Sequence, residues 1–373
     1  MRKIIVVSAV NLVEGGPLTI LHNCLEYLSI NLVNKYEIIA LVNRKELCPF
    51  ESIKCLEFPK SKKAWLNRLY YEYYYFNKLS KRLKPLLWLS LHDITPRVMS
   101  DRLAVYCHNA SPFYKANFHV FQLDPKFMLF NLFYQFLYSI NINRNMYVIV
   151  QQDWMRQEFI KRFRLKNVIV AHPEYTDNFD TFSLNKSDLF TFIYPAFPRV
   201  FKNFDVICSA AERLYLKGIS NFKIILTIDG SENKYSRSIY KQFKHLPVLC
   251  FVGLQPKNKI LEYYRISDCL IFPSKLETWG LPITEFKKYD KPILLANLPY
   301  ARETVGKYSK VKFFSSDNSE ELACSMESLI NKTLEFDPVH AGTIKQPYAQ
   351  NWEQLFDILL SEQPDAVSVK DNC

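Results

Sequence analysis

The sequence predicts an α/β protein with two doubly wound, Rossmann-like domains that face a cleft. Short apolar runs alternate with helix-like stretches, which favours parallel strands covered by helices on both faces. The alternation stops at a polar, turn-rich segment over residues 174–190 and then starts again. A length of 373 residues also favours two domains, at about 100–200 residues each. We therefore expect an N-terminal domain over residues 1–180 and a C-terminal domain over residues 188–345.

In the N-terminal half, short apolar runs predict strands, and apolar residues spaced three or four apart predict helices. Leu18, Leu21, Leu25 and Leu28 illustrate the second pattern, because they fall on one face of a helix. The expected strands are 4–10, 36–42, 103–107, 147–150 and 168–171, and the expected helices are 18–32, 64–84 and 153–163.

The C-terminal half repeats the alternation. The expected strands are 190–194, 222–228, 248–251, 269–272 and 293–296, and the expected helices are 203–216, 234–243, 260–266, 282–289, 319–331 and 352–361. Ligands of such folds bind at the carboxyl ends of the strands, so the turns that follow strands are the places to search for a site.

Composition limits the class of protein. Charged residues make up 23% of the chain, which excludes a mostly disordered protein. The net charge of +11 is uneven, since residues 1–185 hold 24 Lys and Arg against 15 Asp and Glu, and this half is expected to meet an anionic partner. Nine cysteines form no Cys-x-x-Cys pair, and the first apolar run soon meets Asn11 and Glu14. We expect a buried first strand rather than a signal peptide, and a cytoplasmic protein.

Several motifs are absent from the sequence. There is no D-x-D metal motif, no G-x-G-x-x-G, no phosphate-binding G-x-x-x-x-G-K-[ST] and no H-E-x-x-H. An uncharged apolar run of about 18 residues, as needed to span a bilayer, is also missing. We expect no metal and no cofactor, so lysine, arginine and helix N-termini must supply any positive charge at a site.

The most informative stretch runs from Phe272 to Glu285. It leaves a buried strand, crosses a loop and enters a helix at Pro282, so that loop amides and free helix N–H groups are suited to a diphosphate. Glu285 is expected in the first helical turn, where it can accept hydrogen bonds from two neighbouring hydroxyls, such as those of a ribose. Glu277 is expected in the loop. The alternative is a solvated Glu277 and a Glu285 that only stabilises the helix dipole.

Other candidate residues follow strands or open helices. Gly15-Gly16 and Gly253 come after strands and permit close approach of backbone to a ligand, although ordinary turns explain glycine equally well. His108 directly follows the strand at 103–107, yet a lone histidine is usually structural. Arg199 and Lys202 precede the first helix of the second domain, where they are either anion ligands or solvated charges.

Together these residues resemble the E-x7-E signature of the retaining glycosyltransferases of family 4, which have the GT-B fold. The signature is matched by Pro273-Ser274, Glu277, Trp279-Gly280-Leu281-Pro282, Glu285 and Lys291-Pro292-Ile293, and then by Arg302 to Gly306. The chain departs from it at three positions, with Thr278 and Asp290 in place of Gly and Phe286 in place of Ala. Because Thr278 would touch the donor, the identity of the donor sugar does not carry over.

The resemblance implies roles for the candidate residues. Glu285 would bind the nucleotide ribose, while Glu277 and His108 would act as catalytic residues at the transferred sugar. Lys202 would neutralise the diphosphate, with Arg199 in place of an arginine that the family has where this chain has Phe197. The other donor-binding positions would be Gly15, Gly16, Gly253, Thr278, Trp279, Gly280 and Leu281. A last helix, over about residues 350–362, would pack back on the N-terminal domain.

The resemblance therefore implies a glycosyltransferase that moves a sugar from a nucleotide-sugar to an acceptor hydroxyl with retention, in cell-surface polysaccharide or glycolipid assembly. The acceptor would be a saccharide or a lipid-linked saccharide. The apolar run 127–138, near Lys115 and Lys126, indicates peripheral contact with an anionic inner membrane face, unless it forms a buried helix. A sugar-nucleotide epimerase or phosphorylase of the same fold stays open. So does a nucleic-acid-binding protein whose Tyr70–Tyr75 run stacks on bases.

Overall fold

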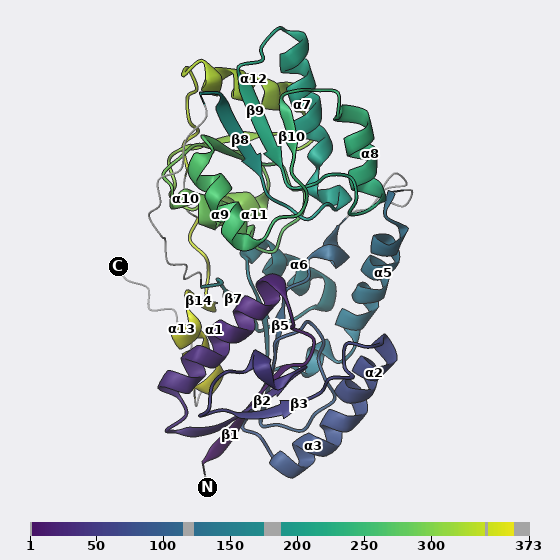
Figure 1. The fold of residues 1–373 in the computed structure, drawn as a ribbon. Coiled ribbons are helices and arrows are strands. Elements are labelled where there is room, and N and C mark those ends of the chain that lie inside the picture. Colours follow the sequence, from purple (N-terminus) through teal and green to yellow (C-terminus); the bar gives the residue numbers. More distant parts are fainter. Residues whose placement is uncertain (1, 115–122, 175–187, 340–341, 362–373) are drawn as a thin grey trace, which may run out of the picture. The chain divides into compact units, whose positions relative to one another are not determined.

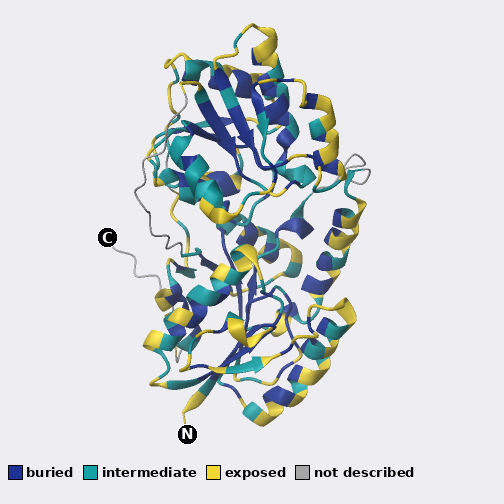
Figure 2. Cartoon of the chain, viewed as in Figure 1, coloured by how far each residue is buried: buried dark blue, intermediate teal, exposed yellow. Residues whose placement is uncertain are grey.

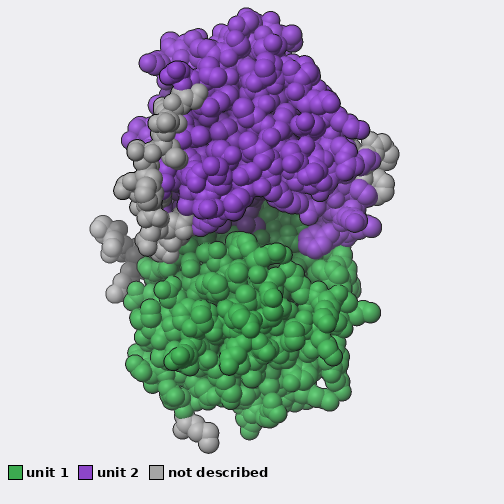
Figure 3. All heavy atoms as spheres, in the orientation of Figure 1, with its two compact units in different colours: residues 1–113, 132–176, 344–373 green, residues 114–131, 177–343 purple. Residues whose placement is uncertain are grey.

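The structure, a computed structural model, describes residues 2–114, 123–174, 188–339 and 342–361. Packing divides the chain into two compact units, coloured separately in Figure 3. Unit 1 comprises Met1–Phe113, Leu132–Thr176 and Ile344–Cys373, and unit 2 comprises Tyr114–Asn131 and Asp177–Thr343. Each unit is built on its own parallel sheet (Figure 1), which confirms the expected class of two doubly wound α/β domains.

The sheet of unit 1 has eight strands, and every neighbouring pair among them is parallel. In spatial order they are β14 (Tyr348–Ala349), β7 (Val168–Ala171), β6 (Tyr147–Val150), β5 (Arg102–Cys107), β4 (Leu87–Ser90), β1 (Lys3–Ala9), β2 (Tyr36–Val42) and β3 (Lys54–Glu57). The chain leaves β1 toward β2 on one side and later returns at β4 on the other. The strand order therefore reverses between β1 and β4, which is the switch point where such sheets bind ligands.

The main helices of unit 1 follow these strands. They are α1 (Gly15–Asn31), α2 (Trp65–Tyr70), a π-helical turn (Tyr71–Tyr75), α3 (Phe76–Leu83), the unit 1 part of α5 (Pro125–Ser139), α6 (Asp153–Phe163) and α13 (Trp352–Leu360), with short 3₁₀ turns at Lys45–Leu47, Ser111–Phe113 and Ile142–Arg144. The single helix expected over 64–84 is thus α2, the π turn and α3 in direct succession.

Both faces of the unit 1 sheet are buried under helices, because side chains alternate along each strand. On β1, Ile5 and Val7 share a core with Leu21 of α1 and Phe356 of α13, whereas Val6 shares a second core with Phe76 of α3. Figure 2 shows this buried interior of the sheet. Since Phe356 lies in the first of these cores, the last helix packs within unit 1.

Unit 2 contains a six-stranded sheet of the same kind, with parallel neighbours throughout. Its strands in spatial order are β10 (Leu249–Phe251), β9 (Phe222–Leu226), β8 (Phe190–Tyr194), β11 (Cys269–Phe272), β12 (Ile293–Ala296) and β13 (Val311–Phe314). Its helices are α7 (Phe204–Leu216), α8 (Lys234–Phe243), α9 (Lys257–Ile266), α10 (Leu281–Lys287), α11 (Pro299–Val305) and α12 (Ser319–Ile330), with a 3₁₀ turn at Val200–Lys202. The order reverses between β8 and β11.

Tyr114 and residues 123–131 belong to unit 2 by their packing, although the expected N-terminal domain contained them. The rings of Tyr114 and Phe127 lie 6.0 and 5.2 Å from that of Phe201. Asp124 forms an ion pair with Arg199, with 2.9 Å between Oδ2 and Nη1. The expected boundary between residues 180 and 188 falls largely within 175–187, outside the described residues.

Candidate functional site

The candidate site in unit 2 lies at the switch point of its sheet. The chain leaves β8 toward β9 and leaves β11 toward β12, in opposite directions, so the loops after β8 and β11 flank the switch point at the carboxyl edge, where such sheets bind ligands. One loop carries Arg199 and Lys202, and the other, the Glu277 loop (residues 273–280), carries the sequence signature. The fold therefore brings together the two stretches that the sequence singled out in this unit.

Lys202 and Glu277 meet directly across these loops. The ammonium Nζ of Lys202 contacts Oε1 of Glu277, and the two side chains are 19% and 13% exposed. An ion pair at this depth is largely, but not fully, withdrawn from water. Such a pair can exchange partners with a ligand that brings both a negative group and hydroxyls.

The rest of the Glu277 loop is held in a defined shape. Gly280 has a φ of +86°, in the left-handed region, and a Cβ added there would lie 3.0 Å from Cδ1 of Ile283. The indole Nε1 of Trp279 donates to Oγ1 of Thr284 over 2.9 Å. Leu281 begins α10, one residue before the expected start at Pro282. Thr278 is partly exposed in this loop.

Glu285 is not in the first turn of its helix, contrary to the sequence-based expectation. Because α10 begins at Leu281, Glu285 is its fifth residue, and the first turn contains no acidic residue. Oε2 of Glu285 accepts a hydrogen bond of 2.9 Å from the hydroxyl of Tyr264, a fully buried residue of α9. The carboxylate is thus anchored by a tyrosine that the sequence analysis missed, since α9 offered no motif to mark it.

Arg199 is engaged by Asp124, as described above, and its guanidinium carbon lies 5.4 Å from the ring centroid of Phe197. Its side chain is still 42% exposed. The sequence analysis also missed Asp124, because it lies 75 residues from Arg199 in the sequence and no motif marks it.

Gly253 lies just after β10 with a φ of +70°, and a Cβ there would lie 2.8 Å from Oδ2 of Asp229. The donor-binding roles of Arg199 and Gly253 therefore remain predictions.

In unit 1, Gly15 and Gly16 are the first two residues of α1 rather than a separate loop after β1. Gly15 has a φ of +67°, which favours glycine, and the preceding Glu14 makes no side-chain cap. Glu14 instead pairs with Lys62 on the surface, with 2.9 Å between Oε1 and Nζ. The two glycines therefore form a helix start at the switch point of the unit 1 sheet.

His108 directly follows β5, as expected, and its ring has a fixed tautomer. Nε2 lies 2.7 Å from the carbonyl oxygen of Leu91, which only accepts, so Nε2 carries the proton. Burial lowers the pKa of His108, while the carboxylate of Asp93 opposes this shift. The imidazole is therefore neutral near pH 7. Nδ1 is buried and has no hydrogen-bond partner within the described part of the chain.

Asp93 fixes the backbone around His108. Its Oδ1 accepts from the amide of His108 over 2.6 Å, from the amide of Asn109 over 3.1 Å and from the hydroxyl of Tyr138 over 3.0 Å. Asp93 itself adopts a φ of +71°. The histidine that the sequence singled out thus has a carboxylate support that the sequence analysis did not identify.

A buried charged cluster adjoins this edge of the unit 1 sheet. It consists of Arg68, Glu72 and His92, which are 3%, 0% and 1% exposed. Nη2 of Arg68 lies 3.1 Å from Nδ1 of His92, and Nε2 of His92 lies 3.3 Å from Oε1 of Glu72 and 3.1 Å from Oγ of Ser8. Burial raises the pKa of Glu72 to about 8, although Arg68 opposes the shift, and burial lowers that of His92 well below its usual value.

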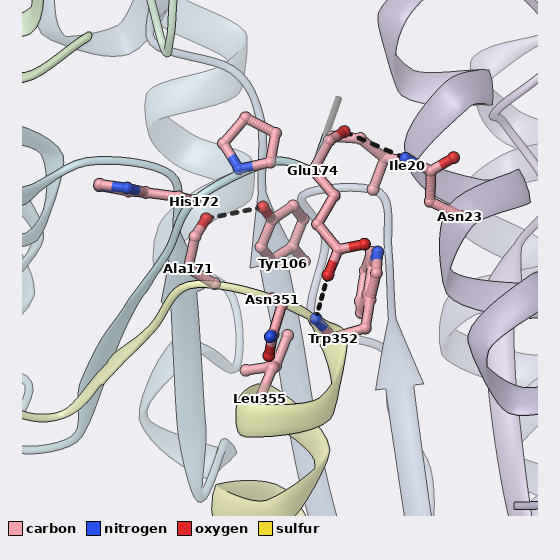
Figure 4. A pocket seen from close by; sticks show the side chains of 10 residues that line it. Ile20, Asn23, Tyr106, Ala171, His172, Glu174, Asn351, Trp352 and Leu355 are labelled. Atoms are coloured by element: carbon pink, nitrogen blue, oxygen red, sulfur yellow. Dashed lines mark hydrogen bonds between the residues drawn. The ribbon is translucent and has the colours of Figure 1, made fainter. Parts of the chain in front are cut away.

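A small pocket of unit 1 is lined by groups that hydrogen-bond to one another (Figure 4). Asn23 of α1 donates to the carbonyl of Glu174 over 3.1 Å, and the carboxylate of Glu174 accepts from the amide of Trp352 over 2.8 Å. Tyr106 donates to the carbonyl of Ala171 over 3.1 Å. The pocket's polar groups thus tie α1 and α13 to the end of β7.

Neither a metal cluster nor a spanning helix occurs in the described residues. No group of three His, Cys, Asp or Glu side chains there is placed to hold a metal ion. Among the same residues, no helix has both the length and the apolar character that crossing a membrane requires.

Comparisons with known proteins agree on the class of this chain. Residues 175–339 match the family model of glycosyl transferases group 1. In sequence, no curated protein matches the chain. Among solved structures, the chain is similar to a sucrose-phosphate synthase from Thermosynechococcus elongatus, with 12% identity, a TM-score of 0.63 and coverage of 89% of this chain and 90% of that one.

Two further structures are similar to nearly the whole chain. A glycosyltransferase from Rickettsia africae has 16% identity and a TM-score of 0.64, with 88% of each chain covered. Anabaena HepE, solved with UDP and glucose, has 16% identity and a TM-score of 0.57, with 90% of each chain covered. At such identities the likeness shows the fold, which is GT-B. The match to the group 1 model falls almost entirely within the second unit of this fold.

Proposed function

We propose that this protein transfers a sugar from a nucleotide-sugar donor to an acceptor hydroxyl, with retention at the anomeric carbon and without a metal ion. The observation that carries the proposal is the contact of Lys202 with Glu277 at the switch point of the group 1 domain. A cation and a carboxylate there match the two parts of a nucleotide-sugar, because the diphosphate needs positive charge and the sugar hydroxyls need acceptors.

In this proposal, donor binding exchanges the partners of the ion pair. The ammonium of Lys202 turns to the diphosphate and stabilises the charge that develops as the nucleoside diphosphate leaves. Glu277 then accepts hydrogen bonds from the transferred sugar. Glu285, anchored by Tyr264, accepts hydrogen bonds from the ribose hydroxyls. The other donor-binding positions of the signature keep the roles that the resemblance implies.

Retention follows from attack on the face that the nucleoside diphosphate leaves, through an oxocarbenium-like state. The acceptor proton passes to the departing diphosphate oxygen as the new glycosidic bond forms. Both glutamates have binding roles here, unlike the acid and nucleophile pair of a retaining glycosidase. His108 offers Nδ1 to a hydroxyl of the transferred sugar as an acceptor, since its Nε2 proton is held by Leu91.

A thermal-shift screen with nucleoside diphosphates and nucleotide-sugars tests donor binding. A ligand at about 100 times its dissociation constant stabilises the folded state by about 2.7 kcal/mol. Lys202→Met should abolish this shift, while Lys275→Met should keep it, because Lys275 lies in the neighbouring Glu277 loop but pairs with Asp317. Glu285→Ala should weaken nucleotide binding, and Glu277→Ala should mainly lower turnover. Equal shifts for wild type and Lys202→Met would contradict the assignment.

We further propose that the acceptor is a lipid-linked or growing cell-surface saccharide, reached at the inner membrane face. The apolar run expected to rest on the membrane forms α5, and it has two faces. Phe127, Leu137 and Tyr138 are buried, whereas other apolar side chains of the helix are exposed: Leu129 by 65%, Phe130 by 37%, Leu132 by 58% and Phe136 by 63%. These four exposed apolar side chains on one helix favour contact with the interface of a membrane.

Aromatic and basic residues of α2, the π turn and α3 extend this surface within unit 1. The ring of Trp65 lies 5.0 Å from that of Phe133 of α5, and Leu66 beside it is 79% exposed. Tyr70 and Tyr74 are each 51% exposed, and the ammonium of Lys78 lies 4.5 Å from the ring centroid of Tyr74. Aromatic rings with adjacent cations suit the headgroup zone of an anionic bilayer. Lys115 lies outside the described residues.

Sedimentation with anionic and zwitterionic vesicles tests the membrane proposal. Wild type should bind phosphatidylglycerol vesicles at low salt and dissociate at high salt. Leu66→Ser combined with Phe136→Ser should lose binding, while Leu216→Ser, at an equally exposed leucine of α7, should not. Absence of wild-type binding at low salt, with full activity on a soluble acceptor, would contradict it.

A further inference from the structure

Two buried tyrosines lie beneath the Lys202–Glu277 pair, and each holds one of its two loops. Tyr194, the last residue of β8, donates from its hydroxyl to the backbone carbonyl of Lys202 over 2.7 Å. Tyr300, on α11, donates to the backbone carbonyl of Ser274 over 2.6 Å. Their exposed fractions are 0% and 3%. Each side of the ion pair therefore has its own tyrosine hydroxyl as a backbone support.

The two supported loops are also joined to one another. The amide of Lys275 donates to the carbonyl of Phe201 over 2.7 Å. Lys275 follows Ser274, and Phe201 precedes Lys202, so this bond lies next to both of the supported carbonyls. At the far end of the Glu277 loop, the hydroxyl of Thr304 contacts the carbonyl of Trp279. Because Tyr300 and Thr304 lie one turn apart on α11, this helix holds the loop on both sides of Glu277.

The tyrosine rings are themselves fixed by packing. The ring of Phe272, the last residue of β11, lies 5.7 Å from that of Tyr194 and 6.4 Å from that of Tyr300, edge to face in both cases. Tyr194 also packs 4.7 Å from Phe204 at the start of α7. Such contacts leave the rings little freedom, so their hydroxyls stay aimed at the loop carbonyls.

Both hydroxyls stay protonated, and therefore remain donors, at any working pH. Burial raises the pKa of each tyrosine well above its ordinary value, and the nearby carboxylate of Glu277 raises both further.

We propose that Tyr194 and Tyr300 are positioning residues of the transfer reaction, which set Lys202 and Glu277 against the donor without touching it themselves. The inference rests on the proposed function and adds residues outside the E-x7-E signature. The two tyrosines act on different parts of the site. Tyr194 acts through Lys202 and should affect binding of the diphosphate, whereas Tyr300 acts through the Glu277 loop and should affect turnover.

The test uses three variants of the full chain that each remove one hydroxyl. Tyr194→Phe and Tyr300→Phe delete the supports, and Tyr308→Phe is the matched control, because Tyr308 donates to the carbonyl of Lys291 over 2.6 Å, away from both loops. The dissociation constant of the nucleoside diphosphate, and kcat and KM for the donor, are measured for each, together with the melting temperature.

We expect Tyr194→Phe to weaken nucleoside diphosphate binding about five- to tenfold, as the loss of one hydrogen bond allows. Tyr300→Phe should lower kcat by a similar factor, with the dissociation constant of the nucleoside diphosphate within about twofold of wild type. Tyr308→Phe should leave both within about twofold. Should Tyr300→Phe fail to fold, Thr304→Val replaces it, with the same expectation, because Thr304 holds the same loop.

The inference is overturned if wild type binds and turns over a nucleotide-sugar while Tyr194→Phe and Tyr300→Phe behave like Tyr308→Phe. It is also overturned if both lose binding and turnover alike in proportion to a drop in melting temperature, since that marks a purely structural role. Failure of the proposed function is distinct, because wild type would then bind no nucleoside diphosphate and transfer no sugar.

Discussion

Replacing Glu72 by glutamine should remove a pH-dependent penalty on folding. Glu72 is fully buried on the π turn, near Arg68, His92 and Tyr73, and burial raises its pKa from 4.5 to about 8. As pH rises through 4.5, the unfolded chain ionises this carboxyl, while the folded chain keeps it protonated until about 8. The unfolded state is thereby favoured, so the free energy of unfolding falls over this window. Glutamine resembles the protonated side chain and does not titrate.

The magnitude follows from the size of the shift. Each pH unit inside the window costs about 1.4 kcal/mol, so the penalty is about 1 kcal/mol at pH 5 and about 3 kcal/mol at pH 7. Glu72→Gln should therefore gain about 2 kcal/mol relative to wild type between these two pH values. For a unit of this size, the gain corresponds to about 4–8 °C in melting temperature. His92 is present in both proteins, so its own titration largely cancels in the difference.

Differential scanning calorimetry of wild type and Glu72→Gln at pH 5, 6, 7 and 8 measures this difference. Glu51→Gln is the control, because Glu51 is exposed. The melting temperature of Glu72→Gln should rise steadily relative to both other proteins as pH increases. Parallel pH profiles for Glu72→Gln and wild type would refute the reasoning, because they would show that Glu72 titrates alike in both states.

Two other perturbations follow from the structure and from the proposed mechanism. Gly253→Ala should destabilise unit 2 by about 1–3 kcal/mol, since its Cβ would lie 2.8 Å from Asp229 at a φ of +70°. Calorimetry should show a smaller loss of stability for Gly218→Ala, where φ is +83° but no atom lies within 4 Å of the added Cβ. Equal losses of stability in the two variants would show that contact with Asp229 is not the cause. Sugar transfer should persist in EDTA, as the metal-free mechanism requires. Complete inhibition that added divalent metal reverses would contradict that mechanism.

Much of the fold was accessible from the sequence because strands and turns are sharply marked. The runs at 190–194, 269–272 and 293–296 are β8, β11 and β12 to the residue, since polar or turn residues bound each apolar run. Strand β4 was missed although Pro85 marks the end of the helical stretch before it. Helix α11 was missed because seven residues carry too little periodicity.

The sequence identified candidate site residues only where a motif or a chain position marks a loop. Glu277 was singled out from the signature and Lys202 from its place before the first helix of the second domain, and the structure shows the two side chains in contact at the switch point of the sheet. Tyr264, Asp93 and Asp124 act through partners distant in sequence, so no local pattern marks them. Helix α5 shows the same limit, because an apolar run does not reveal which of its side chains the fold will cover.

The measurement that tests the central claim most directly is transfer itself. Wild type is incubated with the nucleotide-sugar that gives the largest thermal shift and with a panel of saccharide and lipid-linked acceptors, and the product is examined by NMR. The account predicts acceptor-dependent release of the nucleoside diphosphate and a glycoside with the anomeric configuration of the donor, both lost in Glu277→Gln. An inverted product, or release that neither needs an acceptor nor responds to Glu277→Gln, would contradict it.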